Sequence, residues 1–178
     1  YGQCGHVIGK LISNVVSKVI GPTIWHAEST NLHNCQDILK ENQLEVTMMY
    51  ANREILASMI RDDVEFSISL KFPSNYPLKS IEVTNLKSGV FTEQEIKLWS
   101  MTMSKMVTSQ NCDILGVLML WKSNYDKKFE GVEPCPICYS IVHEDTYSIP
   151  ILQCKTCKNK FHAACLKKWF RTSNKNKC

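Results

Sequence analysis

The chain has 178 residues, of which 44% are hydrophobic, and it carries a formal net charge of +4 at pH 7. This length and apolar content are enough for a buried core, and they exclude a small secreted domain held together by disulfides. No apolar run reaches the roughly 18 residues that a membrane span needs, and no secretory segment is visible. We therefore expect a cytosolic protein without a membrane partner.

The chain begins at Tyr1 without an initiating methionine and ends on Cys178, so we expect a C-terminal piece of a longer protein. Residues 1–24 are predicted to form an amphipathic helix, the end of an upstream helical region. Apolar residues recur there in pairs every four residues: Val7, Ile8, Leu11, Ile12, Val15, Val16, Val19 and Ile20. This period marks one helix face, and Gly21-Pro22 predicts the end of the helix.

Between residues 42 and 86 the apolar period changes to two, which is typical of strands with one buried and one wet face. The clearest example is residues 64–72, where Val, Phe, Ile, Leu and Phe alternate with polar residues. Further strands are predicted at residues 44–48, 55–60 and 81–86. Polar turns at residues 51–53 and 61–63 connect the first three strands, so the segment is predicted to be an antiparallel meander.

Two helices are predicted after the strands, which gives an α+β fold. Thr92 and Glu95 form a capping box, and the next residues mark one helical face with Ile96, Trp99, Met103 and Met106. Residues 114–125 are nearly all apolar, so this helix is predicted to be buried against the sheet. The charged residues 126–133, with one glycine, predict a short hinge.

The end of the chain is rich in metal-ligand residue types. It contains two Cys-x-x-Cys pairs and a later His-x-x-Cys pair: Cys135, Cys138, Cys154, Cys157, His162 and Cys165, followed by Cys178. Thiolate and neutral imidazole are the ligands that zinc prefers, and two cysteines separated by two residues can turn back onto one ion. The spacing predicts two zinc sites. A closed shell of four ligands leaves no position for water, so both are predicted to be structural.

His143 lies between the two cysteine pairs and is an alternative ligand, although the pattern is complete without it. Cys4, Cys35 and Cys112 have no partner at metal spacing, and we interpret them as structural. Residues 127–178 hold ten Lys or Arg against four acids, whereas residues 1–126 hold eleven against thirteen. A solvated basic face is the simplest interpretation, and a nucleic-acid or ribosomal contact is the alternative.

The meander, the turn at Tyr76-Pro77 and the two following helices resemble the RWD domain, a relative of the ubiquitin-conjugating fold that lacks its catalytic cysteine. The resemblance covers residues 25–126. The family's turn usually has a second proline four positions after the first, where this chain has Ile81. The resemblance implies a protein-interaction module.

Residues 127–178 resemble a RING finger of the variant class with cysteine at the fourth ligand, Cys157. The cross-brace arrangement of that family implies two zinc ions, the first held by Cys135, Cys138, His162 and Cys165. It implies a second ion held by Cys154, Cys157 and Cys178, with a fourth ligand that the chain lacks. A PHD finger shares the ligand order but usually has an aromatic residue where this chain has Asn176. Ile137 and Trp169 occupy the positions at which RING fingers carry an aliphatic residue and a tryptophan.

An RWD-like domain followed by this variant RING resembles the listerin family of ribosome-associated ubiquitin ligases, most specifically over residues 154–162 and 168–170. The resemblance implies a ubiquitin ligase that docks a ubiquitin-charged conjugating enzyme through Ile137 and Trp169. Ubiquitin would pass to a substrate lysine without a covalent ligase intermediate. By the same resemblance, the substrates would be nascent chains on stalled large ribosomal subunits in the cytosol. The alternative is a non-enzymatic zinc-bearing adaptor or a PHD-like peptide reader.

Overall fold

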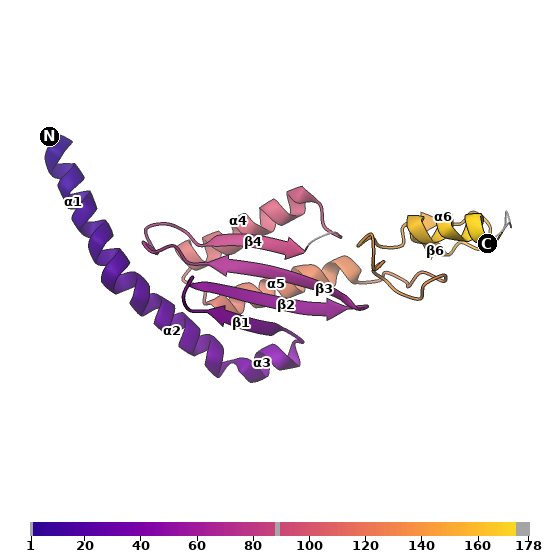
Figure 1. Ribbon diagram of the computed structural model, residues 1–178, viewed down its shortest axis with the longest axis horizontal. Helices are drawn as coiled ribbons and strands as arrows, with labels where there is room; N and C mark the ends of the chain where they lie inside the picture. The colour runs from indigo at the N-terminus through magenta and orange to yellow at the C-terminus, as the bar shows by residue number, and fades with distance from the viewer. Residues whose placement is uncertain (1, 88–89, 174–178) are drawn as a thin grey trace.

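The computed structural model describes residues 2–87 and 90–173, and the side chains of residues 6–84 and 90–173. A long helix leads into a four-stranded antiparallel sheet with two helices against it, and a small module lies beyond one end of the sheet (Figure 1). We call residues 42–129 the sheet domain and residues 135–173 the metal module. The predicted α+β class is confirmed.

The N-terminal helix continues past the predicted end at Gly21-Pro22, so that prediction was wrong. It consists of α1 (Gly2–Val15), the π-helical turn η1 (Val16–Ile20) and α2 (Gly21–Asn34). Proline has no N–H and its ring crowds the preceding turn, and the wider π turn that ends at Ile20 accommodates this. Gly21 serves another purpose: a Cβ there would lie 2.9 Å from the Ser74 carbonyl oxygen, so glycine lets the helix approach this loop.

The first half of this helix exposes its predicted apolar face, with Val7, Leu11 and Val15 each more than half exposed. Because the helix does not stop at residue 20, the segment His6–Asn34 is long and apolar enough to cross a membrane by length and composition alone. The sequence-based expectation that no segment reaches that length was therefore wrong. Length and composition alone do not make this helix a membrane span, because a core helix or an N-terminal signal sequence passes the same test.

The predicted meander is confirmed. After the short helix α3 (Gln36–Glu41), the strands β1 (Glu45–Met49), β2 (Glu54–Arg61), β3 (Val64–Lys71) and β4 (Glu82–Lys87) pair antiparallel in the order of the chain. A two-residue turn joins β2 to β3, because Arg61 pairs with Val64. The predicted turn before β4 contains a cis peptide bond between Tyr76 and Pro77.

Two helices cover one face of the sheet (Figure 1). Helix α4 (Glu93–Ser109) begins with the predicted capping box, in which the Thr92 hydroxyl accepts from the Glu95 N–H. Helix α5 (Ile114–Phe129) runs four residues further than predicted, into the expected hinge. The reason is Phe129, which is 3% exposed and packs on Tyr125 and Phe66, so the last helical turn belongs to the core.

The metal module is built from small elements: β5 (Leu152–Gln153), β6 (Lys160–Phe161) and α6 (Ala163–Thr172). Its own buried cluster consists of Cys135, Phe161 and Cys165, whereas Val142 packs into the cluster of the sheet domain. The domain boundaries expected at residues 24 and 126 stay predictions. The helix α2 crosses the first of them, and α5 crosses the second.

Candidate metal centre

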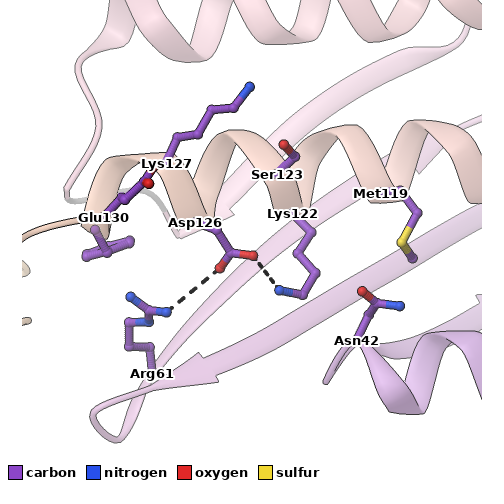
Figure 2. A pocket seen from close by; sticks show the side chains of 9 residues that line it. Asn42, Arg61, Met119, Lys122, Ser123, Asp126, Lys127 and Glu130 are labelled. Carbon is purple, nitrogen blue, oxygen red and sulfur yellow. Dashed lines mark hydrogen bonds and ion pairs between the residues drawn. The ribbon is translucent and has the colours of Figure 1, made fainter.

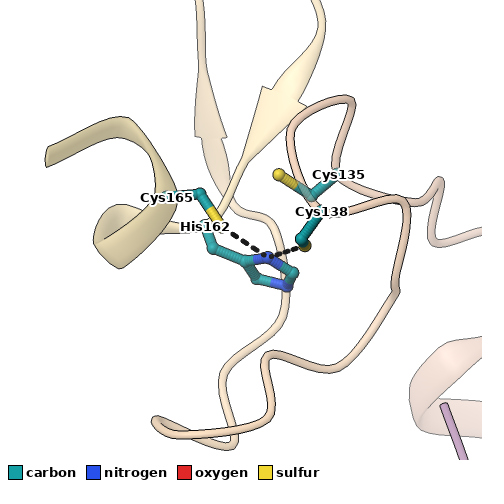
Figure 3. A group of neighbouring side chains, drawn as sticks. All are labelled: Cys135, Cys138, His162 and Cys165. Atoms are coloured by element: carbon teal, nitrogen blue, oxygen red, sulfur yellow. Dashed lines mark hydrogen bonds between the residues drawn. The ribbon is translucent and has the colours of Figure 1, made fainter. Parts of the chain in front are cut away.

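Four predicted ligands meet in the metal module. One ligand atom from each of Cys135, Cys138, His162 and Cys165 lies within 4.8 Å of every other (Figure 3). The first two come from the turn that opens the module, His162 follows β6, and Cys165 lies in the first turn of α6. The structure thus brings together the first predicted ligand set from two segments more than twenty residues apart.

Tight backbone turns direct the cysteine side chains toward one another. The Cys135 N–H donates to the Ser140 carbonyl and the Tyr139 N–H donates to the Cys135 carbonyl. Residues 154–159 repeat this pattern, and the residues after the second cysteine, Tyr139 and Lys158, have φ of 59° and 63°. This is the knuckle that the Cys-x-x-Cys spacing predicts.

A third turn repeats the knuckle without a second cysteine. The His143 N–H donates to the Ser148 carbonyl, the Tyr147 N–H donates to the His143 carbonyl, and Tyr147 has a φ of 51°. However, the His143 Nδ1 accepts the backbone N–H groups of Asp145 and Thr146 at 3.3 and 3.4 Å. That nitrogen is therefore occupied, and His143 does not join the four-residue cluster.

The hydrogen bonds of His162 leave its other nitrogen available for a metal ion. Nε2 lies 3.0 Å from the Ile141 carbonyl oxygen, and a carbonyl can only accept, so Nε2 carries the proton. Nδ1 then faces the Cys138 Sγ at 3.3 Å and the Cys165 Sγ at 3.7 Å. Burial lowers the pKa of His162, which favours the neutral ring that binds metals. Ligating histidines commonly donate their second N–H to a backbone carbonyl in this way.

The charges of the cluster call for a cation. Burial alone would raise the pKa of the Cys135 thiol, but N–H groups of His162, Ile137 and Cys138 hold that pKa below its ordinary value. Burial and the neighbouring Cys138 and Cys135 raise the pKa of Cys165 to about 12. Several thiolates cannot ionise side by side without a positive charge between them, and three sulfur atoms with one imidazole nitrogen form a donor set that zinc accepts. The residues present fit a metal ion.

The second predicted ligand set is described in part. Cys154 and Cys157 form their knuckle, with the Thr156 N–H donating to the Cys154 Sγ at 3.4 Å. Cys178 lies outside the described residues. The second site therefore stays a prediction.

The two predicted docking residues, Ile137 and Trp169, line one cavity of about 450 Å³. Trp169 is 39% exposed, so it does not pack inside the module. Sequence reasoning missed the other apolar side chains that line the same cavity: Pro136, Tyr139, Phe161, Leu166 and Phe170. Tyr139 follows the second ligand and is 83% exposed, and Phe170 follows Trp169, so their positions next to known site residues were the available signal.

A second cavity, of about 580 Å³, lies between β2 and α5 (Figure 2). Two of its cations pair with one carboxylate: Asp126 lies 3.8 Å from the Arg61 guanidinium and accepts from Lys122 (Figure 2). The first of these ion pairs links β2 to α5, and both point to a structural role.

The comparisons with known proteins agree with this arrangement. Residues 44–128, which hold the sheet and most of α5, match the family model described as ubiquitin conjugating domain-like. The chain is 36% identical over 178 residues to the E3 ubiquitin-protein ligase listerin of Gallus gallus, covering 100% of this chain and 10% of that protein.

Two further relatives carry the same name. The identity is 38% over 168 residues with the listerin of Mus musculus, covering 94% of this chain and 9% of that protein. It is 39% over 169 residues with the listerin of Saccharomyces cerevisiae, covering 94% of this chain and 11% of that protein. The chain thus spans about a tenth of the length of these relatives, and over that length it aligns almost from end to end. Together with the confirmed fold and the Cys/His cluster, these similarities show that the chain belongs to the listerin family.

Proposed function

We propose that the chain is the part of a RING-type ubiquitin ligase that docks a ubiquitin-charged conjugating enzyme and promotes transfer of ubiquitin to a substrate lysine. One observation carries the proposal: Ile137 and Trp169 line the same cavity beside the metal cluster, in a chain whose relatives are named ubiquitin ligases. Ile137 lies between two ligand residues, and Trp169 lies on the helix that carries a third. Metal binding would thus fix both sides of the cavity.

The metal in this proposal is zinc, with two ions per chain. Cys135, Cys138, His162 and Cys165 would hold the first, and Cys154, Cys157 and Cys178 would contribute to the second. When bound, zinc supplies folding free energy to a module whose apolar core is too small to fold without it. Its shell of four protein ligands leaves no open position for a substrate.

The ligase would act by positioning. Holding a thioester and an amine in a reactive geometry can supply a large share of a barrier, and this requires no covalent ligase intermediate. The one cysteine of the sheet domain, Cys112, fits this view. Burial raises the pKa of Cys112, and the nearby Asp113 raises it further, which is opposite to the activation that a nucleophilic thiol needs.

The resemblance to the family extends the proposal to the substrate. We infer nascent chains on stalled large ribosomal subunits, in the cytosol, where a reducing environment keeps zinc-binding thiols free of disulfides. The C-terminal part that contains the metal module is basic, because residues 127–178 carry ten Lys or Arg against four acids. A basic surface favours a partner rich in phosphate.

Replacement of Trp169 tests the docking role. Truncating a central aromatic anchor costs about 2 kcal/mol or more, roughly a thirtyfold loss of affinity, so Trp169→Ala should strongly reduce ubiquitin discharge from conjugating enzymes. The zinc content should stay unchanged, because Trp169 is not a ligand. Ile151→Ala is the matched control, since Ile151 is a 70% exposed apolar residue of the same module that does not line the cavity.

The readout is discharge to free lysine with a panel of charged conjugating enzymes, alongside zinc stoichiometry. Wild-type discharge by a fully metallated Trp169→Ala protein would falsify the docking role. A wild-type chain that discharges no conjugating enzyme in the panel would favour the adaptor function.

A further inference from the structure

A loop of the metal module packs into the sheet domain. Within residues 139–150, Val142 is 1% exposed and belongs to the buried cluster of the sheet domain. Ile141 and Ile149 pack against the same cluster. The third turn, at residues 143–148, folds this loop back. Its apolar residues therefore reach the sheet domain while its ends stay in the metal module. The two parts are joined by packing as well as by the connecting chain.

Asp62 holds this loop. It lies in the turn between β2 and β3, at the end of the sheet that faces the metal module (Figure 1). Its Oδ2 accepts the backbone N–H of Ile141 at 2.6 Å and that of Val142 at 3.1 Å. Hydrogen bonds to an ionised acceptor are shorter and about twice as strong as neutral ones. One carboxylate therefore anchors the two residues that enter the sheet domain.

The same contacts continue to the metal cluster. The Ile141 carbonyl accepts the Nε2–H of His162 at 3.0 Å, and this bond leaves Nδ1 facing the cysteines. Asp62 thus binds the N–H of Ile141, and the carbonyl of Ile141 orients the ring of His162. Groups that orient a ligating histidine from behind affect both ring position and metal affinity.

The turn that carries Asp62 is fixed to the sheet domain. The neighbouring Arg61 guanidinium lies 4.8 Å from the centre of the Phe129 ring and 5.7 Å from that of Tyr125. It also pairs with Asp126 at 3.8 Å. Asp62 and Asp63 have φ of 50° and 62°, as a two-residue type I′ turn requires. The carboxylate is therefore presented from a fixed position.

We propose that Asp62 is a positioning residue that fixes the orientation of the metal module on the sheet domain. This orientation also sets the direction in which a docked conjugating enzyme presents ubiquitin, a step that rests on the proposed function. A freely tethered module would sample many directions. A clamped module instead keeps the cavity of Ile137 and Trp169 at one place relative to whatever the sheet domain binds.

Three variants distinguish the effect of losing the Asp62 carboxylate from the effect of disturbing the turn. Asp62→Gly removes the acceptor but suits the positive φ, so the hairpin should persist. Asp62→Asn keeps an acceptor oxygen and also suits the turn, so it should keep the wild-type orientation of the metal module. Asp63→Gly is the matched control, because Asp63 lies in the same turn and makes no hydrogen bond or ion pair with the metal module among the described residues. Amide exchange over residues 54–71 checks that the hairpin is intact in each.

The first readout is orientation, measured by residual dipolar couplings on the full zinc-loaded chain. A single alignment tensor should describe residues 45–129 and 135–172 in the wild type, Asp62→Asn and Asp63→Gly. Asp62→Gly should require two different tensors. A single shared tensor in Asp62→Gly would overturn the proposal.

The second readout is the metal. Loss of a charged hydrogen bond that supports a ligand should make zinc transfer from the cluster to a chelator about tenfold faster in Asp62→Gly. Equal rates of zinc transfer in Asp62→Gly and Asp63→Gly would contradict the proposal that Asp62 supports His162.

The third readout is activity, in two forms. Discharge to free lysine should be unchanged in Asp62→Gly, because a diffusing acceptor needs no fixed direction. The set of lysines modified by autoubiquitination, mapped by mass spectrometry, should broaden. An unchanged set would contradict the directional role. If the wild type shows no discharge, the proposed function fails, and the tensor measurement still decides the role of Asp62.

Discussion

The sheet domain and the metal module reach stability by different routes. The sheet domain buries a cluster of aromatic rings, in which Phe66 contacts Phe91, Tyr125 and Phe129 with centroids 4.7 to 6.4 Å apart. The metal module buries His162 together with Cys135, Phe161 and Cys165, three of which belong to the Cys/His cluster that could hold a metal ion. About forty residues cannot enclose a sufficient apolar core, so coordination replaces packing. In the sheet domain, buried side chains only stabilise the fold. In the metal module, the residues that stabilise the fold also hold the cavity of Ile137 and Trp169 in place.

The largest expected effect comes from breaking the metal cluster. Cys138→Ser removes a ligand that lies 3.3 Å from the His162 Nδ1. Structural zinc contributes on the order of 10 kcal/mol to small modules, so we expect the metal module to lose its fold. Amide exchange should show lost protection confined to residues after about 130.

The control is Cys35→Ser, which removes a cysteine outside the cluster and should leave protection and zinc content unchanged. Loss of protection across residues 45–125 in Cys138→Ser would show instead that the two parts fold as one unit.

The converse change addresses the sheet domain. Phe66→Ala should lower its free energy of unfolding by about 3 to 5 kcal/mol, because Phe66 is 1% exposed and lies at the centre of the aromatic cluster. Zinc stoichiometry should not change. Urea denaturation with metal analysis measures both quantities.

Ile60→Ala, at a 67% exposed position on the neighbouring strand, is the control and should change stability by less than about 0.5 kcal/mol. Loss of zinc from Phe66→Ala under native conditions would contradict independent stabilisation of the metal module.

The sequence was informative where a pattern is local and repeated. Alternation over residues 64–72 predicted β3, the Thr92 and Glu95 spacing predicted a capping box, and the spacing of Cys135 and Cys138 predicted a knuckle, all within one or two residues. These features depend on the period of the backbone or on neighbours three residues apart.

The errors arose where distant residues decide the outcome. Gly21 looks like a helix end, but it serves a close approach to Ser74 that sequence does not encode locally. Residues 126–129 look like a hinge because they are mostly charged, yet Phe129 extends α5 by packing on Phe66. Asp62 looks like an ordinary turn residue, because its contact with Ile141 spans 79 positions.

A smaller effect concerns a polar group inside the aromatic cluster. The Tyr125 hydroxyl is buried and has no hydrogen-bond partner among the described residues, and burial raises the pKa of that hydroxyl. Tyr125→Phe removes this group and keeps the ring, so it should raise the free energy of unfolding of the sheet domain by about 1 kcal/mol. Urea denaturation of the variant measures the gain.

Tyr50→Phe is the control, because Tyr50 is 61% exposed and its hydroxyl remains hydrated. A loss of more than about 1 kcal/mol in Tyr125→Phe would mean that the Tyr125 hydroxyl has a partner that stabilises the cluster.

The smallest expected effect is a pH dependence that separates the two parts. The Glu95 carboxylate accepts from Lys128 Nζ at 2.8 Å and from the Thr92 N–H at 2.8 Å. Led by the hydrogen bond from Lys128, these contacts lower the pKa of Glu95 from 4.5 to about 2. A carboxyl with a lowered folded-state pKa stabilises the fold above its unfolded value, and this stability is lost as the pH falls from about 4.5 toward 2.

Glu95→Gln should therefore reduce the stability of the sheet domain at pH 7 by at most about 1 kcal/mol, since the pair is partly exposed to water. The difference from wild type should vanish near pH 2. Glu93→Gln is the control from the same helical turn, and we expect no change of the acid slope. Amide exchange restricted to residues 45–125 keeps this measurement separate from the metal module, whose ligands protonate and release zinc in acid. If Glu95→Gln were still less stable than the wild type by the same amount at pH 2, Glu95 would act through packing rather than charge.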